Sequence, residues 1–334
     1  MILDGRQSDA IALAAQRLAA GDLVGLPTET VYGLAADADS EAAVAGIFAA
    51  KGRPSDHPLI VHVHSAEAAA HFARELPEVA RRLMAAFWPG PLTVIVPRRE
   101  GVARAAAGGQ GSVGLRCPSH PVARALLAAC ALLQPPVLGL AAPSANPFGR
   151  VSPTTAAHVR DEFGDGLLVL DGGACAVGIE SAIVDCTRGR PVLLRPGALG
   201  FETIQMACGE RLWRPEEMPG AAPRASGTLA SHYAPQAPLR LIESAALQDA
   251  LEVLGPGAED LGLAVWARQS LTLKARGVRV LPMPAAAADA ARELFAVLRQ
   301  FDADAARLIW VEAPPADAAW DGVRDRLQRA TADR

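Results

Sequence analysis

The 334-residue chain has few cysteines, and their spacing does not suggest a metal site or a redox pair. The five are Cys117, Cys130, Cys175, Cys186 and Cys208, and they form no CxxC pair and no Cys/His cluster at zinc spacing. Each stands in an apolar context, where a free thiol behaves as a small hydrophobic residue. We therefore expect buried, reduced cysteines in a cytoplasmic protein.

An excess of positive charge is also lacking. The chain has 32 Lys and Arg against 36 Asp and Glu, a net charge of -4, so no global basic field drives stable nucleic-acid binding. No apolar run reaches the roughly 18 residues that a membrane-spanning helix needs, and the N-terminus has no signal-peptide core. We expect no membrane partner and no global binding of nucleic acid, although a local basic pocket is still compatible with these totals.

Lysine is the scarcest cation: the chain has two, and one of them, Lys51, stands in Ala50-Lys51-Gly52-Arg53-Pro54. Where arginine is so strongly preferred, a retained lysine indicates a need for a compact ammonium, which suits a polyphosphate. Arg53 is two residues away, and two cations so close favour an anion between them. We expect both to stabilise charge. The alternative for Lys51 is a solvated position at a helix end.

Two histidines flank the segment that follows. His57 precedes the strand predicted at 59–63, and His62 lies within it. A lone strand histidine is usually a hydrogen-bonded core residue, but two on one loop and strand favour contact with a ligand.

Length and an apolar content of 51% predict two domains. Residues 1–208 predict an α/β fold, a twisted mixed sheet with flanking helices. The expected helices are capped by Ser8, Ser40 and Ser65 or begin at Pro77. The expected strands are short and several end in Pro or Gly turns: 23–26, 59–63, 92–96, 113–116, 137–141, 167–170, 181–184 and 192–195.

The pattern lapses at 209–237, where Arg214 to Pro223 has the composition of a linker. Residues 238–334 return to a strand–helix alternation, which predicts a smaller, Rossmann-like parallel α/β domain. This last part has neither GxGxxG nor GxxxxGK[ST], so neither standard nucleotide fingerprint marks it.

Polar residues gather where predicted strands end. Ser144 and Asn146 follow a buried strand on a turn between prolines, and such loops commonly bind ligands in α/β sheets. Arg116 and Arg195 each end an apolar strand shortly before a proline. That position suits an anchored contact to an anion, although a strand-end arginine is more often an ion-pair partner.

Six motifs occur together in one order, and the combination is far more specific than any one of them. They are Thr28-Glu29-Thr30-Val31-Tyr32-Gly33-Leu34, Lys51-x-Arg53 with Pro58-Leu59, Ser144-Ala145-Asn146, Gly178-x-Glu180-Ser181, Leu194-Arg195-Pro196-Gly197 and His232-Tyr233-Ala234-Pro235. The series resembles the long, two-domain form of the threonylcarbamoyl-AMP synthases, the Sua5/YrdC/TsaC family. The motifs cover nearly all of 8–236, and beyond them the resemblance rests on a linker and a small α/β domain.

The resemblance implies a YrdC-like catalytic domain at 1–208, a linker and active-site lid at 209–237, and a small C-terminal domain at 238–334. It implies a nucleotidyltransferase that condenses L-threonine, bicarbonate and ATP into threonylcarbamoyl-AMP and releases pyrophosphate. A downstream tRNA threonylcarbamoyl transferase then uses this product for the t6A modification at position 37 of tRNA.

Carried over motif by motif, the resemblance also implies two sets of binding residues. Those for ATP are Lys51, Arg53, His57, Asn146, Ser152, Arg195 and Tyr233. Those for L-threonine are Thr30, His62, Arg116, Ser144 and Ser181. Arg116 suits the threonine carboxylate, and Tyr233 closes over the nucleotide.

The residue types fit this chemistry independently. Attack of a carbamate oxygen on the α-phosphorus needs positioning, charge neutralisation and exclusion of water, but no protein nucleophile. The chain offers no convincing Ser/His/Asp or Cys/His set. Mg²⁺ is expected with ATP, although no dedicated carboxylate ligand can be identified.

The linker departs from the family pattern, which commonly reads Ser-Pro-Gly-Met-Lys-Tyr-Arg. Here Ser226-Gly227-Thr228-Leu229-Ala230-Ser231 precedes His232, so the contacts of the missing Met, Lys and Tyr are not carried over. Only the His232-Tyr233 end is.

Two alternatives remain open. The first is an RNA- or tRNA-binding module without nucleotide turnover, which predicts steeply salt-dependent binding. Residues 1–208 carry 17 Lys and Arg against 19 Asp and Glu, which argues against it. The second is the related carbamoyl-adenylate domain of hydrogenase maturation proteins, but this chain lacks their acylphosphatase-like segment and Cys-rich zinc motifs.

Overall fold

A computed structural model describes residues 1–220, 222–229, 231–254, 261–273 and 277–331 of the chain. Contacts between residues divide it into two compact units. The first consists of 1–148 and 152–228, and the second of 149–151 and 229–334. Two features of this division differ from the expected boundaries. Residues 209–228, expected in the linker, belong to the first unit, and the three residues 149–151 belong to the second.

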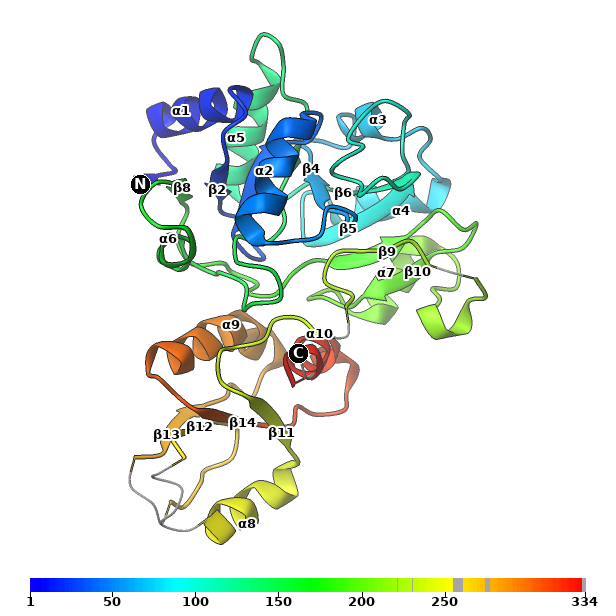
Figure 1. Cartoon of the computed structure of the whole chain (residues 1–334). Coiled ribbons are helices and arrows are strands. Elements are labelled where there is room, and N and C mark those ends of the chain that lie inside the picture. The colour runs from blue at the N-terminus through cyan, green and yellow to red at the C-terminus, as the bar shows by residue number, and fades with distance from the viewer. Residues whose placement is uncertain (221, 230, 255–260, 274–276, 332–334) are drawn as a thin grey trace. The chain divides into compact units, whose positions relative to one another are not determined.

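The first unit is built on a ten-stranded mixed sheet (Figure 1). Its strands are β1 (Ile2–Asp4), β2 (Val24–Leu26), β3 (Gly33–Asp37), β4 (Ile60–His62), β5 (Leu92–Pro97), β6 (Ser112–Arg116), β7 (Leu140–Ala141), β8 (Leu168–Asp171), β9 (Ala182–Asp185) and β10 (Val192–Arg195). They lie in the order β1-β8-β2-β3-β7-β4-β6-β5-β9-β10. Pairs β4–β6 and β5–β9 are parallel, whereas β5–β6 and β9–β10 are antiparallel. The predicted mixed α/β sheet is confirmed.

The helices of this unit cover two apolar cores. They are α1 (Ser8–Ala19), α2 (Glu41–Lys51), α3 (Ala69–Phe72), α4 (Glu78–Phe87), α5 (Pro121–Ala131), α6 (Ala156–Phe163) and α7 (Phe201–Cys208), and a short 3₁₀ helix, η1, spans Pro215–Glu217. One core joins α1 and α5, which pack side by side, to β2 and β8. The other contains buried residues of α2, α4 and α7. The five cysteines are buried free thiols, as predicted, and burial raises the pKa of each.

Helix α2 follows its sequence signals closely. Ser40 is the N-cap, and its side chain accepts a hydrogen bond from the Ala43 N–H. At the other end Gly52 adopts φ +61°, the left-handed conformation that ends many helices. These two signals place Lys51 on the last turn.

Two predicted caps are wrong. Ser8 is the first residue inside α1, because the Gln7 carbonyl already accepts from the Ile11 N–H and makes Gln7 the N-cap. Ser65 accepts from the Ala68 N–H, but a turn intervenes and α3 starts only at Ala69. The strand predicted at 137–141 shrinks to β7, since the Val137 N–H binds the Cys130 carbonyl at the end of α5 instead of a neighbouring strand.

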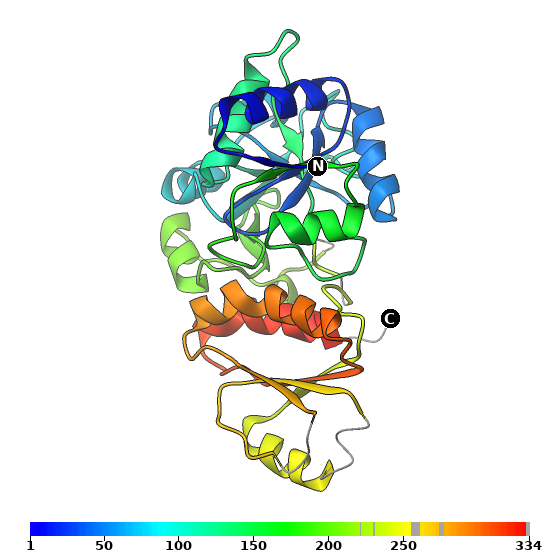
Figure 2. The ribbon, with the colours of Figure 1, turned by 90° about the vertical axis from the view of Figure 1, so that its left-hand side faces the viewer.

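The second unit carries a four-stranded parallel sheet, as predicted. Its strands β11 (Leu239–Ile242), β12 (Leu263–Ala267), β13 (Arg279–Pro282) and β14 (Leu308–Glu312) lie in the order β11-β14-β12-β13. Its helices are α8 (Ser244–Leu254), α9 (Ala287–Ala303) and α10 (Asp321–Thr331). The 3₁₀ helix η3 (Ala318–Trp320) directly precedes α10. Helices α9 and α10 lie alongside each other (Figure 2). Among the described residues, no helix is both long and apolar enough to cross a membrane.

Candidate functional site

Four segments of the first unit meet at the ends of its central strands. Tyr32, in the loop after β2, and Leu34, in β3, contact the loop after β7 through two backbone hydrogen bonds of 2.8 Å, Ala145 N–H to the Tyr32 carbonyl and Leu34 N–H to the Pro143 carbonyl. The Tyr32 N–H binds the Pro153 carbonyl at 2.9 Å, and the Val177 N–H binds the Glu29 carbonyl at 2.8 Å. The motif residues that are far apart in sequence are therefore assembled by main-chain contacts.

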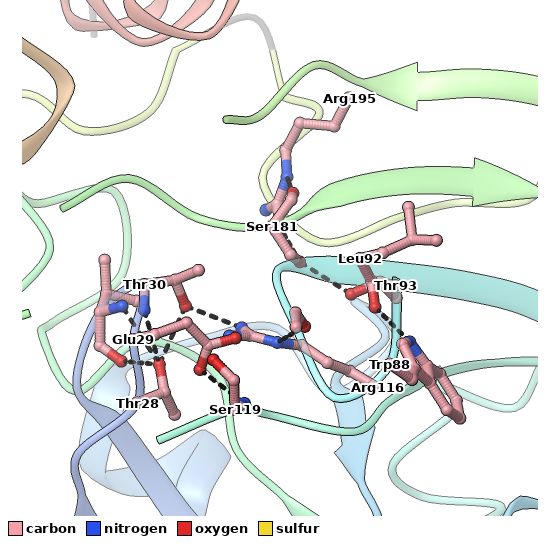
Figure 3. A network of polar contacts seen from close by, with 12 residues as sticks. Thr28, Glu29, Thr30, Trp88, Leu92, Thr93, Arg116, Ser119, Ser181 and Arg195 are labelled. Carbon is pink, nitrogen blue, oxygen red and sulfur yellow. Dashed lines mark hydrogen bonds and ion pairs between the residues drawn. The ribbon is translucent and has the colours of Figure 1, made fainter. Parts of the chain in front are cut away.

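Arg116, at the end of β6, is the centre of a buried polar network (Figure 3). Its Nη2 lies 2.7 Å from Oε1 of Glu29, and its Nη1 donates to Oγ1 of Thr30 at 2.7 Å. The Ser119 N–H donates to the other carboxylate oxygen of Glu29 at 3.1 Å. Burial would raise the pKa of Glu29, but Arg116 and these hydrogen bonds bring it below its usual value. The network therefore holds a fixed guanidinium cation in a dry site.

His62 lies beside Arg116, because the two residues pair in register on the parallel strands β4 and β6. Its side chain is buried, with 3% exposed. Burial and the neighbouring Arg116 cation lower the pKa of His62 to about 3, so the ring is neutral at pH 7. Within the described part of the chain its buried Nδ1 has no hydrogen-bond partner. A buried polar atom without a partner is costly, and it is commonly satisfied by a ligand or a water. The core-histidine alternative leaves this atom unexplained.

Ser181 and Arg195 form a second network next to β5. The hydroxyls of Ser181 and Thr93 lie 2.7 Å apart, and Nε and Nη2 of Arg195 donate to the Ser181 carbonyl at 3.0 and 2.8 Å. Figure 3 shows these three side chains in a line. Nη1 of Arg195 donates to the carbonyl of Ser226 at 2.9 Å, which ties the segment expected to be linker to the end of β10.

Lys51 is buried, with 3% exposed, so the solvated helix-end alternative is wrong. Its ammonium donates to two main-chain carbonyls of the loop after β7, that of Ser144 at 2.6 Å and that of Asn146. Its own carbonyl accepts from the Phe148 N–H at 2.8 Å. Burial, and then the nearby Arg53 cation, depress the pKa of Lys51 well below its ordinary value. One side chain therefore joins the end of α2 to the Ser144–Asn146 loop.

Arg53 and His57 both contact the ring of Phe148. The Arg53 guanidinium lies 5.5 Å from the ring centroid, and the His57 ring is edge-on at 5.3 Å. Arg53 also donates to the Pro58 carbonyl at 2.9 Å. Burial and Arg53 lower the pKa of His57. Arg53 and His57, both expected to bind phosphate, therefore pack against one aromatic ring, a contact that the sequence did not suggest.

Ser152 and Asn146 complete the part of the predicted ATP set that lies in this unit. The Ser152 hydroxyl donates to Oε1 of Glu180 at 2.5 Å, and the Asn146 amide donates to the Pro147 carbonyl at 2.7 Å. Glu180 directly precedes Ser181, so this contact connects the loop after β7 to the start of β9.

A small, partly open cleft lies on the sheet beside these networks. Its lining includes Ile60, Thr93, Gly114 and Ile183 from four neighbouring strands, together with residues 224–226. The cleft therefore combines an apolar floor with polar walls, as small-molecule sites commonly do.

The structure brings together eleven of the twelve residues predicted for substrate binding in one unit: Thr30, Lys51, Arg53, His57, His62, Arg116, Ser144, Asn146, Ser152, Ser181 and Arg195. Tyr233 belongs to the second unit, where its ring is buried. Its contact with a nucleotide stays a prediction, as do the individual roles of the others.

Sequence reasoning missed three residues of these networks: Glu29, Thr93 and Glu180. Glu29 and Glu180 lay within quoted motifs, and an acidic residue beside a predicted anion-binding arginine was the signal that could have found Glu29. Thr93 had no such signal, since its partner Ser181 is far away in sequence. No group of His, Cys, Asp or Glu within the described ranges has the arrangement of a metal site.

Known proteins resemble the chain over nearly its whole length. The family described as "Telomere recombination" matches residues 16–197, and the one described as "Threonylcarbamoyl-AMP synthase, C-terminal domain" matches 200–332. The threonylcarbamoyl-AMP synthase of Pyrococcus abyssi (strain GE5 / Orsay) is 38% identical over 97% of this chain and 94% of its own length.

Two further comparisons are informative. The crystal structure of P. abyssi Sua5 complexed with L-threonine superposes with a TM-score of 0.88 at 35% identity, covering 99% of this chain and 97% of that one. A shorter relative, the putative threonylcarbamoyl-AMP synthase of Mycobacterium tuberculosis (strain ATCC 25618 / H37Rv), is 38% identical and covers 61% of this chain and 91% of its own length.

Proposed function

The chain belongs to the threonylcarbamoyl-AMP synthase family, and from this premise we propose that it condenses L-threonine, bicarbonate and ATP into threonylcarbamoyl-AMP with release of pyrophosphate. The observation that carries the proposal is a near-full-length likeness to a named synthase, and the buried cation Arg116 supports it. The P. abyssi protein of the superposed structure was crystallised with L-threonine, which supports threonine as a substrate here.

The threonine half of the site is assigned to the Arg116 network. A guanidinium held by Glu29 and Thr30 presents its remaining N–H groups to a carboxylate in a fixed direction. The neutral ring of His62 offers a nitrogen next to that position without adding a second charge. Ser181, which lies just before β9 and is fixed by Thr93, supplies a hydroxyl.

The ATP half is assigned to Lys51, Arg53 and His57 on one side and to Arg195 on the other. Asn146 and Ser152 complete it from the loop that Lys51 clamps. The nucleoside is assigned to the cleft over Ile60 and Ile183, since bases bind by stacking and burial of flat apolar faces. Tyr233 is assigned as the residue that closes over the nucleotide.

The reaction proceeds in two balanced steps. The threonine amine takes up bicarbonate to give a carbamate and water, and a carbamate oxygen then attacks the α-phosphorus of ATP as pyrophosphate leaves. Neither step requires a protein nucleophile. The site contributes positioning, cations that offset developing charge, and burial that limits hydrolysis of the carbamate and the mixed anhydride.

This chemistry is adenylyl transfer, so we assign the protein to the nucleotidyltransferases. ATP would enter as its Mg²⁺ complex, because adenylyl transfer commonly uses a metal ion to neutralise the phosphate charge. The product would pass to a separate tRNA threonylcarbamoyl transferase. The two alternatives are disfavoured: neither an RNA-binding module nor a hydrogenase maturation domain accounts for the match that continues through 200–332.

Pyrophosphate release by the purified protein tests the proposal, with threonine and bicarbonate omitted in turn. We expect release only when ATP, threonine and bicarbonate are all present. Release that did not depend on threonine would contradict the proposal. Binding of tRNA with a steep salt dependence and no turnover would favour the RNA-binding alternative.

A further inference from the structure

Tyr233 has an unusual backbone conformation in the second unit. Its φ is +64°, although it is not a glycine, and 1% of the residue is exposed. A bulky residue in the left-handed region is strained and persists only where its surroundings enforce it. Its ring lies 5.5 Å from the ring of Phe295, and the Arg326 guanidinium is 5.4 Å from its centroid. Helices α9 and α10 thus supply the surroundings that hold it.

One face of α9 contacts two other segments of this unit, 149–151 and 232–236, through three side chains. Phe295, Arg299 and Asp302 stand at i, i+4 and i+7, so their side chains project from the same side of the helix. Phe295 packs against Tyr233, and Nη2 of Arg299 donates to the Val151 carbonyl at 2.5 Å. Oδ1 of Asp302 accepts from the Gln236 N–H at 2.8 Å.

The two segments that this face holds are also paired with each other. The Ala234 N–H donates to the Gly149 carbonyl at 2.9 Å, within an isolated parallel bridge between Arg150 and Ala234. Burial raises the pKa of Asp302, while the hydrogen bond from the Gln236 N–H and the Arg150 cation oppose this rise, so groups of both segments act on one carboxylate. Helix α9 therefore contacts two segments that are also hydrogen-bonded to each other.

Both segments adjoin or contain residues that are assigned to ATP. Residues 149–151 directly precede Ser152 and follow the Ser144–Phe148 loop, and residues 232–236 contain Tyr233. Asn146, Ser152 and Tyr233 are all assigned above to ATP. Of the residues predicted for threonine, Thr30, His62, Arg116 and Ser181 lie elsewhere in the first unit, and only Ser144 shares this loop.

We propose that the face of α9 formed by Phe295, Arg299 and Asp302 positions the two ATP-binding segments, and that this is the role of the C-terminal domain in the reaction. The inference rests on the proposed function. It makes Arg299 a positioning residue, which acts through Val151 on the neighbouring Ser152 and does not touch substrate. Damage to this face should weaken the use of ATP and leave the use of threonine almost unchanged.

The test uses the full chain with Arg299→Met, which removes the donor to Val151 and keeps an unbranched side chain. Pyrophosphate release is measured with ATP varied at saturating threonine, and with threonine varied at saturating ATP. We expect KM for ATP to rise about tenfold to a hundredfold, the effect of losing one charged hydrogen bond, and KM for threonine to stay within about twofold. Arg299→Lys should recover part of the loss, because an ammonium can still donate to the carbonyl.

Arg292→Met is the matched control. Arg292 lies on the same helix, is half exposed and pairs with Asp289 at 2.8 Å, so its loss should change neither KM. Asp302→Asn is measured beside Arg299→Met, so that the result does not depend on one variant folding. It should raise KM for ATP by weakening the contact to Gln236.

The inference is overturned if neither Arg299→Met nor Asp302→Asn raises KM for ATP, or if both KM values rise by the same factor. A parent protein that does not release pyrophosphate overturns the proposed function, and the inference with it. A parent protein that turns over normally, with both variants unaffected, overturns the inference alone.

Discussion

Replacing Glu29 by glutamine should damage the site out of proportion to the size of the change. One carboxylate oxygen of Glu29 forms an ion pair with Nη2 of Arg116 at 2.7 Å, and the other accepts a hydrogen bond from the Ser119 N–H. Glutamine has one acceptor oxygen and one NH₂ group. In either orientation the NH₂ must face a donor, and Arg116 loses its counter-charge.

The magnitude follows from burial. Only 4% of the Arg116 side chain and 8% of the Glu29 side chain are exposed, and the pair is 2.7 Å apart. Removing one partner of a buried ion pair costs about 3–5 kcal/mol. Because glutamine keeps one hydrogen bond, we expect about 3 kcal/mol of lost stability, or a fall in Tm of about 6–12 °C. The misaligned guanidinium should also raise KM for threonine about tenfold to a hundredfold, with KM for ATP little changed.

Acid titration gives an independent measure of the same pair. The pKa of Glu29 is lower in the folded protein than in the unfolded chain. Between these two values the unfolded chain binds more protons, so stability falls as pH drops below about 4.5 through the folded pKa. The wild type should lose this contribution over that window, and Glu29→Gln should not show it.

Calorimetry and the two-substrate pyrophosphate assay check these expectations, with Glu75→Gln as the control. Glu75 pairs with Arg74 at 3.4 Å on the surface, with 63% of its side chain exposed, and its loss should change stability by less than about 0.5 kcal/mol. If Glu29→Gln matched wild type in Tm and in KM for threonine, the reasoning about the Arg116 network would be refuted.

Two further predictions concern Lys51 and His62. Lys51→Arg should lower kcat/KM for ATP about tenfold or more, with Tm changed by only a few degrees, because a flat guanidinium cannot replace an ammonium between the carbonyls of Ser144 and Asn146. Near-normal activity in the pyrophosphate assay would show that a point charge is not needed there. Because the folded pKa of His62, about 3, lies below that of the unfolded chain, near 6.5, wild type should lose stability as pH falls below 6.5, by up to about 1.4 kcal/mol per pH unit. His62→Gln should show a shallower loss in urea denaturation between pH 6.5 and 4, and identical slopes would contradict the burial of a neutral ring.

Elements with local signals were predictable. Helix α2 has both a side-chain cap and a glycine stop, and each acts within one turn of the chain. Strand β3 reads Gly33-Leu34-Ala35-Ala36-Asp37 and has no β-branched residue to indicate a strand, yet it pairs with β2 and β7. Tertiary pairing decided its conformation, which intrinsic propensity does not reveal.

The same distinction separates the parts of the site. The motifs identified the residues that gather at the strand ends, because each motif is a short local pattern. They did not reveal that Lys51 binds main-chain carbonyls, since a carbonyl leaves no trace in the identity of its residue. Nor did they reveal the contact of Arg53 and His57 with Phe148, which requires a loop almost a hundred residues away to fold back onto α2.

The assignment of residues 149–151 to the second unit has a consequence for how such a protein could be shortened. The backbone leaves the first unit at 148, returns at 152 and leaves again after 228. No single cut therefore separates two intact modules: a fragment ending at 208 would retain Gly149 and Val151 but lose Ala234 and Arg299, to which they are bound. A form of this chain shortened to its first part would therefore need other contacts to hold residues 149–151.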